Sequence, residues 1–265
     1  MTKQLIITQN KKMVGAPKMT NWILSKDGET WVHKDTPRKL CGRELVAYLW
    51  SEAKGKGKNT LKLTQQQKDI LIGSLLGDGF IVFHKTTRQP TYGFCFAQTW
   101  YAADYVENMY QIFKPFVGTP PKINLIGGIK PGLPKRYEVR FKTYSHDEFK
   151  YYYDLFYPEV DGKRNKRVPK NIKDLLTAEG LAYWYMDDGT RGTPIGKNPV
   201  YVISTHSFAY EDQLILVNAL ETKFGVQSGL YKDKKYLKLS IKKKSRNTFR
   251  ELIQPFIHPY FAYKL

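Results

Sequence analysis

Two short segments of this chain share one plan, an apolar helical run that ends in aspartate followed by glycine. The first, Leu71 to Gly79, reads LIGSLLGDG, and the second, Leu181 to Gly189, reads LAYWYMDDG. A carboxylate at the end of a helix faces the negative end of the helix dipole, so it needs a cation or a proton as its partner. Two such helix ends brought together predict a paired-acid site that holds metal ions. For either segment alone, a simple helix stop is the competing interpretation.

The excess of basic residues limits the kinds of partner. The 265 residues include 43 Lys and Arg against 24 Asp and Glu, a formal net charge of +19 that is spread along the chain. Such a charge indicates a polyanionic partner. Charge alone does not separate nucleic acid from an anionic membrane, and ribosomal proteins are also basic. No apolar run approaches the roughly 20 residues needed to cross a bilayer, so we expect no membrane partner.

Composition predicts a folded chain without disulfide or zinc cross-links. Hydrophobic residues make up 42% of the sequence, which is long enough for one large domain or two smaller ones. The two cysteines, Cys41 and Cys95, show no Cys-x-x-Cys or zinc spacing, so we expect reduced and packed thiols. The first twenty residues lack the apolar segment of a secretion signal. We therefore expect the protein to act where it is made.

The sequence divides into three segments: an extension of unassigned role (1–62), a first repeat (63–160), and a linker with a second repeat (161–265). In the extension, Asp27-Gly28 between two apolar runs (22–24 and 30–32) predicts a hairpin. Residues 43–52 are typical of a short helix, and residues 54–58 of a flexible basic linker.

The two repeats predict nearly the same order of elements. Thr64 and Gln67 form a capping-box signature, so the first motif helix begins near Gln65. The first repeat then predicts strands at 80–84 and 91–98, a helix at 103–116, strands at 122–127 and 136–143, and a helix capped by Ser145 and Glu148 that runs to about 157. The second predicts a helix at 177–188, a strand at 200–206, a helix at 211–224, a hairpin at 229–241 and a helix at 247–256. Only one strand is clear after the second motif, and the loop 190–198 either hides or replaces its partner.

Charged and apolar residues alternate along the later strands of both repeats. In the segment 136–142 the charged residues share one face, and in the segment 237–242 lysines and serine alternate with apolar residues. A basic two-stranded ribbon fits the DNA major groove, although an ordinary half-solvated sheet gives the same pattern. The predicted DNA-binding residues are His84, Lys85, Arg88, Arg136, Arg140, Lys142, Arg191, Lys232, Lys234, Lys238 and Lys242.

The two motifs, together with the terminal Tyr263-Lys264-Leu265, resemble the signatures of single-chain LAGLIDADG homing endonucleases, and the resemblance covers about Gln65 to Leu265. It implies a mixed α/β (α+β) fold in which two pseudo-symmetric repeats form a saddle of antiparallel sheets. It further implies a monomer that cuts both strands of a long, asymmetric double-stranded DNA site and leaves short 3' overhangs. The family context implies an intron-encoded protein of a chloroplast or mitochondrion.

The resemblance also assigns site residues. Asp78 and Asp188 are the expected ligands of two or three Mg²⁺ ions, which carboxylate and phosphate oxygens hold well. Their neighbours Gly77 and Asp187 belong to the predicted metal site, although a helix cap or a position behind the ligands explains Asp187 better. Further catalytic residues implied by alignment are Lys166, Lys264 and Gln98, with His206 as the counterpart of Gln98. A surface charge or a strand end explains each of these residues as well.

Small residues in the first motif predict close helix packing. Gly73 and Gly77 lie one turn apart and would let a second helix approach the backbone. The second motif departs from this pattern, because Tyr183 and Asp187 stand in the place of the two glycines. We therefore expect an asymmetric interface.

Two other functions fit the same motifs. A group I intron maturase would use the basic surface to hold intron RNA without cutting DNA, and a non-catalytic DNA-binding regulator would have lost the acids. The presence of both aspartates favours the endonuclease. A basic run at 163–167 is typical of a nuclear-localisation signal, of a solvated segment or of a phosphate contact.

Overall fold

The computed structural model describes residues 22–24, 30–33, 39–41, 61–85, 89–127, 135–160, 162–192 and 199–265. Near the N-terminus, an antiparallel sheet has the order β1 (Trp22–Leu24), β2 (Thr30–His33), β3 (Lys39–Cys41). The predicted hairpin is thereby confirmed. The helix expected at 43–52, the linker at 54–58 and Arg88 lie outside the described residues.

The first motif helix leads into a four-stranded antiparallel sheet. Thr64 and Gln67 form the predicted capping box at the start of this helix, because each side chain accepts a hydrogen bond from the other residue's backbone N–H. The two helices that follow in this half cover one face of the sheet. The elements are α3 (Gln65–Leu76), β4 (Phe80–His84), β5 (Thr91–Thr99), α4 (Ala103–Phe113), β6 (Lys122–Gly127), β7 (Arg136–Lys142) and α5 (Glu148–Phe156), with strand order β4-β5-β7-β6.

The predicted cap of α5 is wrong. The helix begins at Glu148 after Asp147, which makes no capping bond through its side chain. The hydroxyl of Ser145 instead donates to Thr91 Oγ1 at 3.2 Å, and the Glu148 N–H donates to Nδ1 of His146. Ser145 thus joins two segments of the first half rather than starting a helix.

The second half repeats the order of the first, with strands in the order β10-β11-β13-β12. The strand that the sequence left unresolved is present as β10, which follows α7 directly and pairs with β11. Its brevity explains why the hydrophobic pattern did not reveal it. The elements are α7 (Ala178–Asp188), β10 (Gly189–Arg191), β11 (Tyr201–Ile203), α8 (Tyr210–Phe224), β12 (Ser228–Asp233), β13 (Tyr236–Ile241) and α9 (Arg246–Ile253).

A short connection joins the halves, and 3-10 turns end the described chain. Arg167 anchors the connection to α8 through a two-pronged ion pair with Asp212, at 2.6 and 3.0 Å. In the described ranges, no helix has the length and apolar character to cross a membrane. The remaining elements are η2 (Trp100–Ala102), η3 (Lys114–Phe116), β8 (Glu159–Val160), β9 (Lys163–Arg164), α6 (Ile172–Leu175), η4 (Lys243–Ser245), η5 (Gln254–Phe256) and η6 (Pro259–Lys264).

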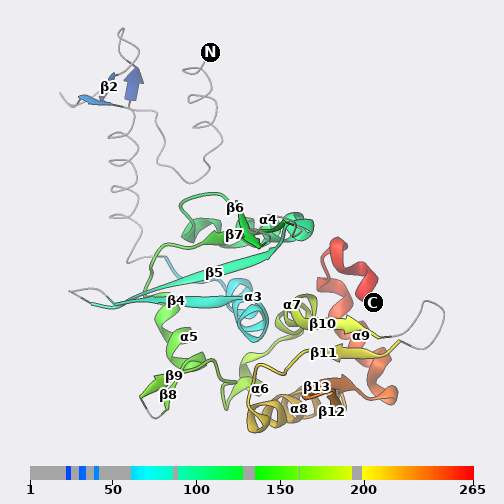
Figure 1. The fold of residues 1–265 in the computed structure, drawn as a ribbon. Helices are drawn as coiled ribbons and strands as arrows, with labels where there is room; N and C mark the ends of the chain where they lie inside the picture. The colour runs from blue at the N-terminus through cyan, green and yellow to red at the C-terminus, as the bar shows by residue number, and fades with distance from the viewer. Residues whose placement is uncertain are drawn as a thin grey trace.

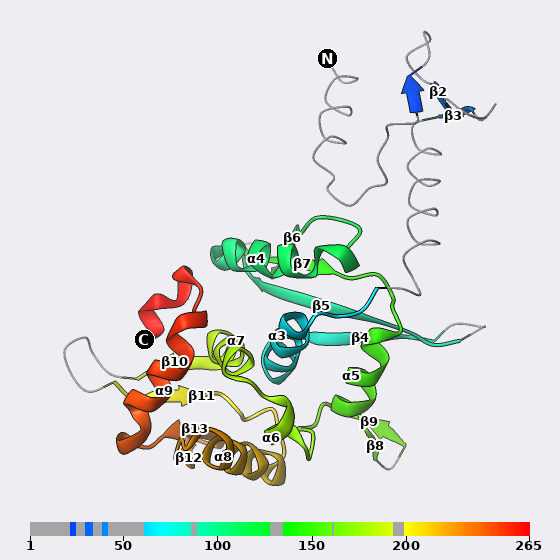
Figure 2. The same cartoon turned by 180° about the vertical axis from the view of Figure 1, so that it is seen from behind.

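Helices α3 and α7 pack side by side between the two sheets (Figures 1 and 2). A Cβ on Gly73 would lie only 1.9 Å from the Gly180 carbonyl oxygen, so the backbones touch at this crossing. Fully buried side chains such as Leu71 and Trp184 surround it, and burying one such leucine contributes about 2 kcal/mol. The crossing fixes the two motif ends relative to each other.

Candidate active site

Asp78 and Asp188 lie where each motif helix passes into the first strand of its sheet. Helix α3 ends at Leu76, and the Gly79 N–H turns back to donate to the Ser74 carbonyl at 2.8 Å. Asp188 is the last residue of α7, and β10 begins at the next residue. The two carboxylates are close enough for the charge of Asp78 to act on Asp188.

Asp187 joins the two helix ends. Its Oδ2 accepts the Asp78 N–H at 3.2 Å, and its Oδ1 accepts the Tyr105 hydroxyl at 3.0 Å and Nε2 of Gln98 at 3.4 Å. A Cβ on Gly77 would lie 2.6 Å from the Asp187 Cβ, so glycine is needed opposite it. Because both oxygens of Asp187 already accept protein donors, its geometry suits holding the site together better than holding a metal.

The two halves surround their aspartates differently. Gln98, at the end of β5, donates through Nε2 to Asp78 Oδ2 at 2.5 Å. The prediction that His206 is its counterpart is wrong. Strand pairing matches Phe80 and Cys95 of the first half with Thr190 and Val202 of the second. This register places Thr205 in the position of Gln98, and Thr205 is buried and donates to Gln213 Oε1 at 2.9 Å.

The two predicted lysines lie at the carboxyl ends of the motif helices. Nζ of Lys166 donates to the carbonyl oxygens of Gly77 and Gly79, both at 2.9 Å, and Nζ of Lys264 donates to the Met186 carbonyl at 2.6 Å. An ammonium group at this end complements the helix dipole. Burial lowers the pKa of Lys166 to about 8 and also lowers the pKa of Lys264, while the nearby aspartates oppose both shifts.

Three crowded carboxyl groups make this region electrostatically costly. Burial, followed by repulsion from Asp78, raises the pKa of Asp188 to about 7. Burial also raises the pKa of Asp78, although Gln98 and the two lysines oppose the shift, and the pKa of Asp187 is raised strongly. A divalent cation beside these oxygens would remove that cost, so the residues fit one.

The composition of the cluster limits what the protein could offer a metal. Within the described ranges, no group of three or more His, Cys, Asp or Glu side chains is arranged to hold a metal ion. Mg²⁺ is commonly held by one or two carboxylates together with waters and substrate phosphates. Asp78 and Asp188 would be such a pair.

Basic side chains of the first sheet share the face away from the helices. Val139 and Phe141 of β7 are buried on the helix side, so the residues between them lie on the other face. There, Nζ of Lys142 lies 2.6 Å from His84 Nε2, and Nε of Arg140 pairs with Glu138 at 2.8 Å. The predicted residues on or beside this face are His84, Lys85, Arg136, Arg140 and Lys142.

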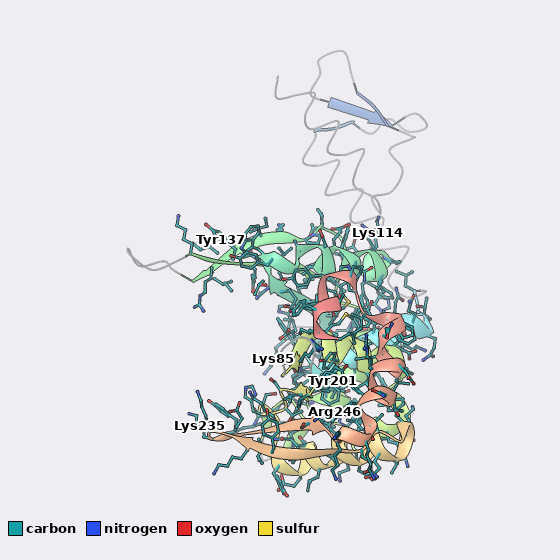
Figure 3. The ribbon with its side chains drawn as sticks, turned by 90° about the vertical axis from the view of Figure 1, so that its right-hand side faces the viewer. Lys85, Lys114, Tyr137, Tyr201, Lys235 and Arg246 are labelled. Carbon is teal, nitrogen blue, oxygen red and sulfur yellow. The ribbon has the colours of Figure 1, made fainter. Side chains whose placement is uncertain are left out.

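In the second sheet, only some of the predicted DNA-binding residues lie on the face away from the helices. Lys238 and Lys242 lie on the face opposite the buried Leu239 and Ile241, and Lys234 lies in the turn between β12 and β13. Figure 3 shows the two sheets projecting to the same side of the molecule, with Tyr137 on one and Lys235 at the tip of the other.

The assignments of Lys232 and Arg191 to this face are wrong. Lys232 pairs with Leu237, and Arg191 pairs with Tyr201, whose ring is fully buried on the helix side. Side chains alternate with a period of two, so a one-residue error in register moves a side chain to the other face.

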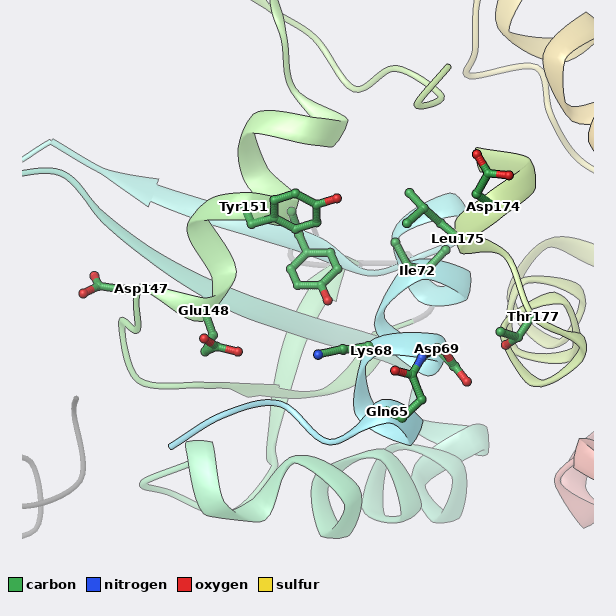
Figure 4. A pocket seen from close by; sticks show the side chains of 11 residues that line it. Gln65, Lys68, Asp69, Ile72, Asp147, Glu148, Tyr151, Asp174, Leu175 and Thr177 are labelled. Atoms are coloured by element: carbon green, nitrogen blue, oxygen red, sulfur yellow. Dashed lines mark hydrogen bonds between the residues drawn. The ribbon is translucent and has the colours of Figure 1, made fainter. Parts of the chain in front are cut away.

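A hollow of about 460 Å³ opens at the opposite ends of the motif helices (Figure 4). A 12-residue helix is about 18 Å long, so this hollow is remote from Asp78. The carboxylate of Glu148 in it is already held by Nζ of Lys62 at 2.8 Å and by the Leu63 N–H. Its lining residues are Gln65, Lys68, Asp69, Ile72, Asp147, Glu148, Tyr151, Tyr152, Asp174, Leu175 and Thr177.

The sequence patterns did not predict two residues that shape the site and the helix crossing. Tyr105 is fully buried in α4 and reaches Asp187 from a helix with no motif of its own. Gly180 provides the close contact that Tyr183 cannot, one turn earlier in α7. A search for any glycine near the start of the second motif helix, rather than at the aligned position, would have found it.

With this geometry established, comparison with known proteins identifies the family. The model of the LAGLIDADG DNA endonuclease family matches residues 68–249. The chain belongs to this family. It is 30% identical over 231 residues to the DNA endonuclease I-ChuI of Chlamydomonas applanata, an alignment that covers 77% of this chain and 96% of that protein.

Two further comparisons bear on fold and function. The structure of the homing endonuclease I-WcaI bound to its DNA recognition sequence matches with a TM-score of 0.69 and 27% identity, over 81% of this chain and 92% of that one. This likeness confirms the mixed α/β fold of two pseudo-symmetric repeats. The cytochrome b mRNA maturase bI2 of Saccharomyces cerevisiae is 28% identical over 80% of this chain and 50% of its own length.

Proposed function

We propose that this protein is a site-specific homing endonuclease that hydrolyses both strands of a long, asymmetric DNA duplex and leaves short 3' overhangs. The observation that carries the proposal is the meeting of Asp78 and Asp188 at adjacent helix ends, each with a lysine beside it. The names of the relatives support it, because I-ChuI is a DNA endonuclease and I-WcaI is a homing endonuclease bound to DNA.

The site residues have distinct roles in this proposal. Asp78 and Asp188 would hold Mg²⁺, which when bound neutralises phosphate charge and lowers the pKa of water. Lys166 and Lys264 would place positive charge near the scissile phosphates of a bound duplex. Gln98 orients the Asp78 carboxylate, and Asp187 fixes the two helix ends.

The asymmetry of the two halves fits a non-palindromic target. Each sheet would lie along one half-site with its basic face toward the DNA, and side chains on the strands would reach base edges in the major groove. Both halves lie in one chain, so we propose that the protein binds DNA as a monomer. Sedimentation of the DNA-free protein as a stable dimer would contradict this proposal.

Intron encoding in an organellar genome completes the proposal. A relative in Wickerhamomyces canadensis, 28% identical over 78% of this chain, is a probable intron-encoded endonuclease. Detection of the coding sequence inside an intron of a chloroplast or mitochondrial genome would support the assignment, and a nuclear gene without an intron context would contradict it.

Cleavage of a randomised double-stranded DNA library with Mg²⁺, followed by sequencing of the ends, tests the activity directly. We expect ends with one common overhang at one long motif for the wild-type protein, and none for Asp78→Asn or Asp188→Asn. An Asp174→Asn variant is a matched control, because this exposed aspartate lies far from the site. Cleavage by either active-site variant at the wild-type rate would refute the assignment.

Intron RNA binding is a second candidate function, favoured by the relationship to the cytochrome b mRNA maturase. RNA binding does not exclude cleavage of DNA by the same chain.

A further inference from the structure

Three arginines gather on the helix-covered side of the second sheet, and no described acidic side chain pairs with them. Arg191 of β10 lies opposite Tyr201, and Arg246 and Arg250 are one turn apart on α9. The three guanidinium groups make no ion pair or hydrogen bond with any residue that the structure describes, and Nε of both Arg191 and Arg246 is buried without an acceptor. Buried polar groups normally have partners, so the described residues leave this cluster without an acceptor.

The start of α9 adds further positive charge that no acidic residue in its first turn balances. Lys243 and Lys244 precede Arg246, and the first turn of the helix contains no acidic residue. Ser245 does not cap the helix, because its hydroxyl accepts the Gln227 N–H at 2.9 Å. Cations at the positive end of a helix dipole are unfavourable, and so are like charges one turn apart. An anion at this place would relieve both costs.

Packed aromatic rings lie beside the three arginines. The ring of Phe249, which lies between Arg246 and Arg250 in the sequence, packs on Tyr201 at 5.4 Å and on Tyr185 at 5.2 Å between centroids. Figure 3 labels Tyr201 and Arg246 together on the body of the second half, apart from the hairpin tip at Lys235. All three arginines act electrostatically on the Tyr201 hydroxyl, where their charges oppose the rise in pKa that burial causes.

The cluster is separate from the proposed DNA surface. Arg191 shares the buried face of Tyr201 and Ile203, whereas Lys238 and Lys242 lie on the opposite face of the same sheet. A duplex held on the basic faces of the two sheets would therefore leave the arginines available to another ligand.

We propose that Arg191, Arg246 and Arg250 form a phosphate-binding site on the outer side of the second half, and that its ligand is the backbone of a folded RNA. Guanidinium groups bind phosphate oxygens in pairs, which suits three neighbouring arginines of which Arg250 is exposed. The similarity to an mRNA maturase favours RNA over a second DNA. The inference extends the second candidate function and is independent of DNA cleavage.

Fluorescence anisotropy with labelled transfer RNA as the probe, added to the full chain already saturated with unlabelled duplex DNA, tests the site. We expect Arg246→Gln/Arg250→Gln to weaken RNA binding about 10-fold and to lower the slope of log affinity against log salt by about one to two. Lys173→Gln/Lys223→Gln removes the same charge from exposed positions of α6 and α8, and we expect a change within about twofold.

Further variants and measurements show whether the arginines bind phosphate or only stabilise the fold. Arg246→Lys/Arg250→Lys keeps the charge but loses the paired N–H donors, so its RNA affinity should lie between those of the wild-type protein and the glutamine variant. Thermal melts report the fold of each variant. Equal RNA affinity in the glutamine variant and its matched control would overturn the proposal. A loss of duplex DNA binding with unchanged RNA binding would also overturn it, because the cluster would then belong to the DNA surface.

Discussion

The two halves of the molecule share one order of helices and strands but differ around their aspartates. In the first half, Gln98 donates directly to the carboxylate of Asp78. In the second half, Thr205 occupies the corresponding position and is turned to Gln213, and the Asp188 side chain has no hydrogen bond within the part of the chain that the structure describes. One carboxylate is therefore oriented by a side-chain hydrogen bond, whereas no described residue orients the other in this way.

The lysines differ in the same sense. Lys166 bridges two carbonyl oxygens in the turn after α3, whereas Lys264 is more deeply buried and donates to one carbonyl of α7. Two nonequivalent half-sites suit an enzyme that cuts the two strands of an asymmetric target at different rates.

The largest expected effect is the loss of double-strand cleavage on removing either aspartate. Both carboxylates contribute to one composite site, so we expect Asp78→Asn and Asp188→Asn each to slow cleavage about 1,000-fold or more. DNA affinity, measured without divalent metal, should stay within a few-fold. If one variant kept full activity on both strands, the half-sites would be independent rather than composite.

The contact between the halves gives the next largest effect. Gly73→Ala places a methyl group against the Gly180 carbonyl, so we expect a loss of about 3 kcal/mol in the free energy of unfolding. Gly229→Ala is the control, because Lys242 Cε, at 3.6 Å, is the one described atom that its Cβ would meet. Chemical denaturation compares the two. Equal losses would show that the crossing tolerates separation of the helices.

This interface also shows what the sequence could predict. The capping box of Thr64 and Gln67 and the glycine surface of α3 follow local rules, and both are present. Gly180 and Tyr105 could not be predicted, since their roles depend on where α7 and α4 cross in space. Thr205 was missed for a related reason, because alignment by motif spacing ignores the register of paired strands.

A third prediction concerns stability and pH. The pKa of Asp188 is raised to about 7 in the folded protein from an ordinary value of 3.8, so folded protein binds more protons and its free energy of unfolding falls as pH rises from about 4 to 7. Asp188→Asn removes this cost. Without metal, we expect it to add about 2 kcal/mol at pH 8 and little at pH 4.

Denaturation at both pH values, with and without Mg²⁺, measures this effect. Mg²⁺ should stabilise the wild-type protein at pH 8 and should stabilise the variant much less. A variant that is equally stabilised at pH 4 and pH 8 would show that the Asp188 charge is not the cause.

The difference between Gln98 and Thr205 gives a smaller effect on rate. A hydrogen bond to a charged group contributes about 1.5 kcal/mol, so we expect Gln98→Ala to slow cutting of one strand about 10-fold. Nicked DNA should accumulate in a time course on a plasmid that carries the target. Thr205→Ala should leave the ratio of the two nicking rates unchanged. Equal slowing of both strands by Gln98→Ala would remove the basis for the asymmetry.

The smallest effect separates the two faces of the second sheet. Lys238 lies on the proposed DNA face and Lys232 on the other. We expect Lys238→Ala to weaken DNA binding about threefold and to reduce the salt slope by roughly one, with Lys232→Ala nearly neutral. Binding titrations at several salt concentrations measure both. The reverse order would show that the DNA follows the other face.

Diffraction from a Mn²⁺-soaked complex of the protein with its selected DNA site tests the central claim most directly. Anomalous peaks should lie within coordination distance of the carboxylates of both Asp78 and Asp188, with Asp187 still bonded to the Asp78 N–H. Metal held by only one of the two aspartates, or by Asp187 in their place, would contradict a composite site built from the two helix ends.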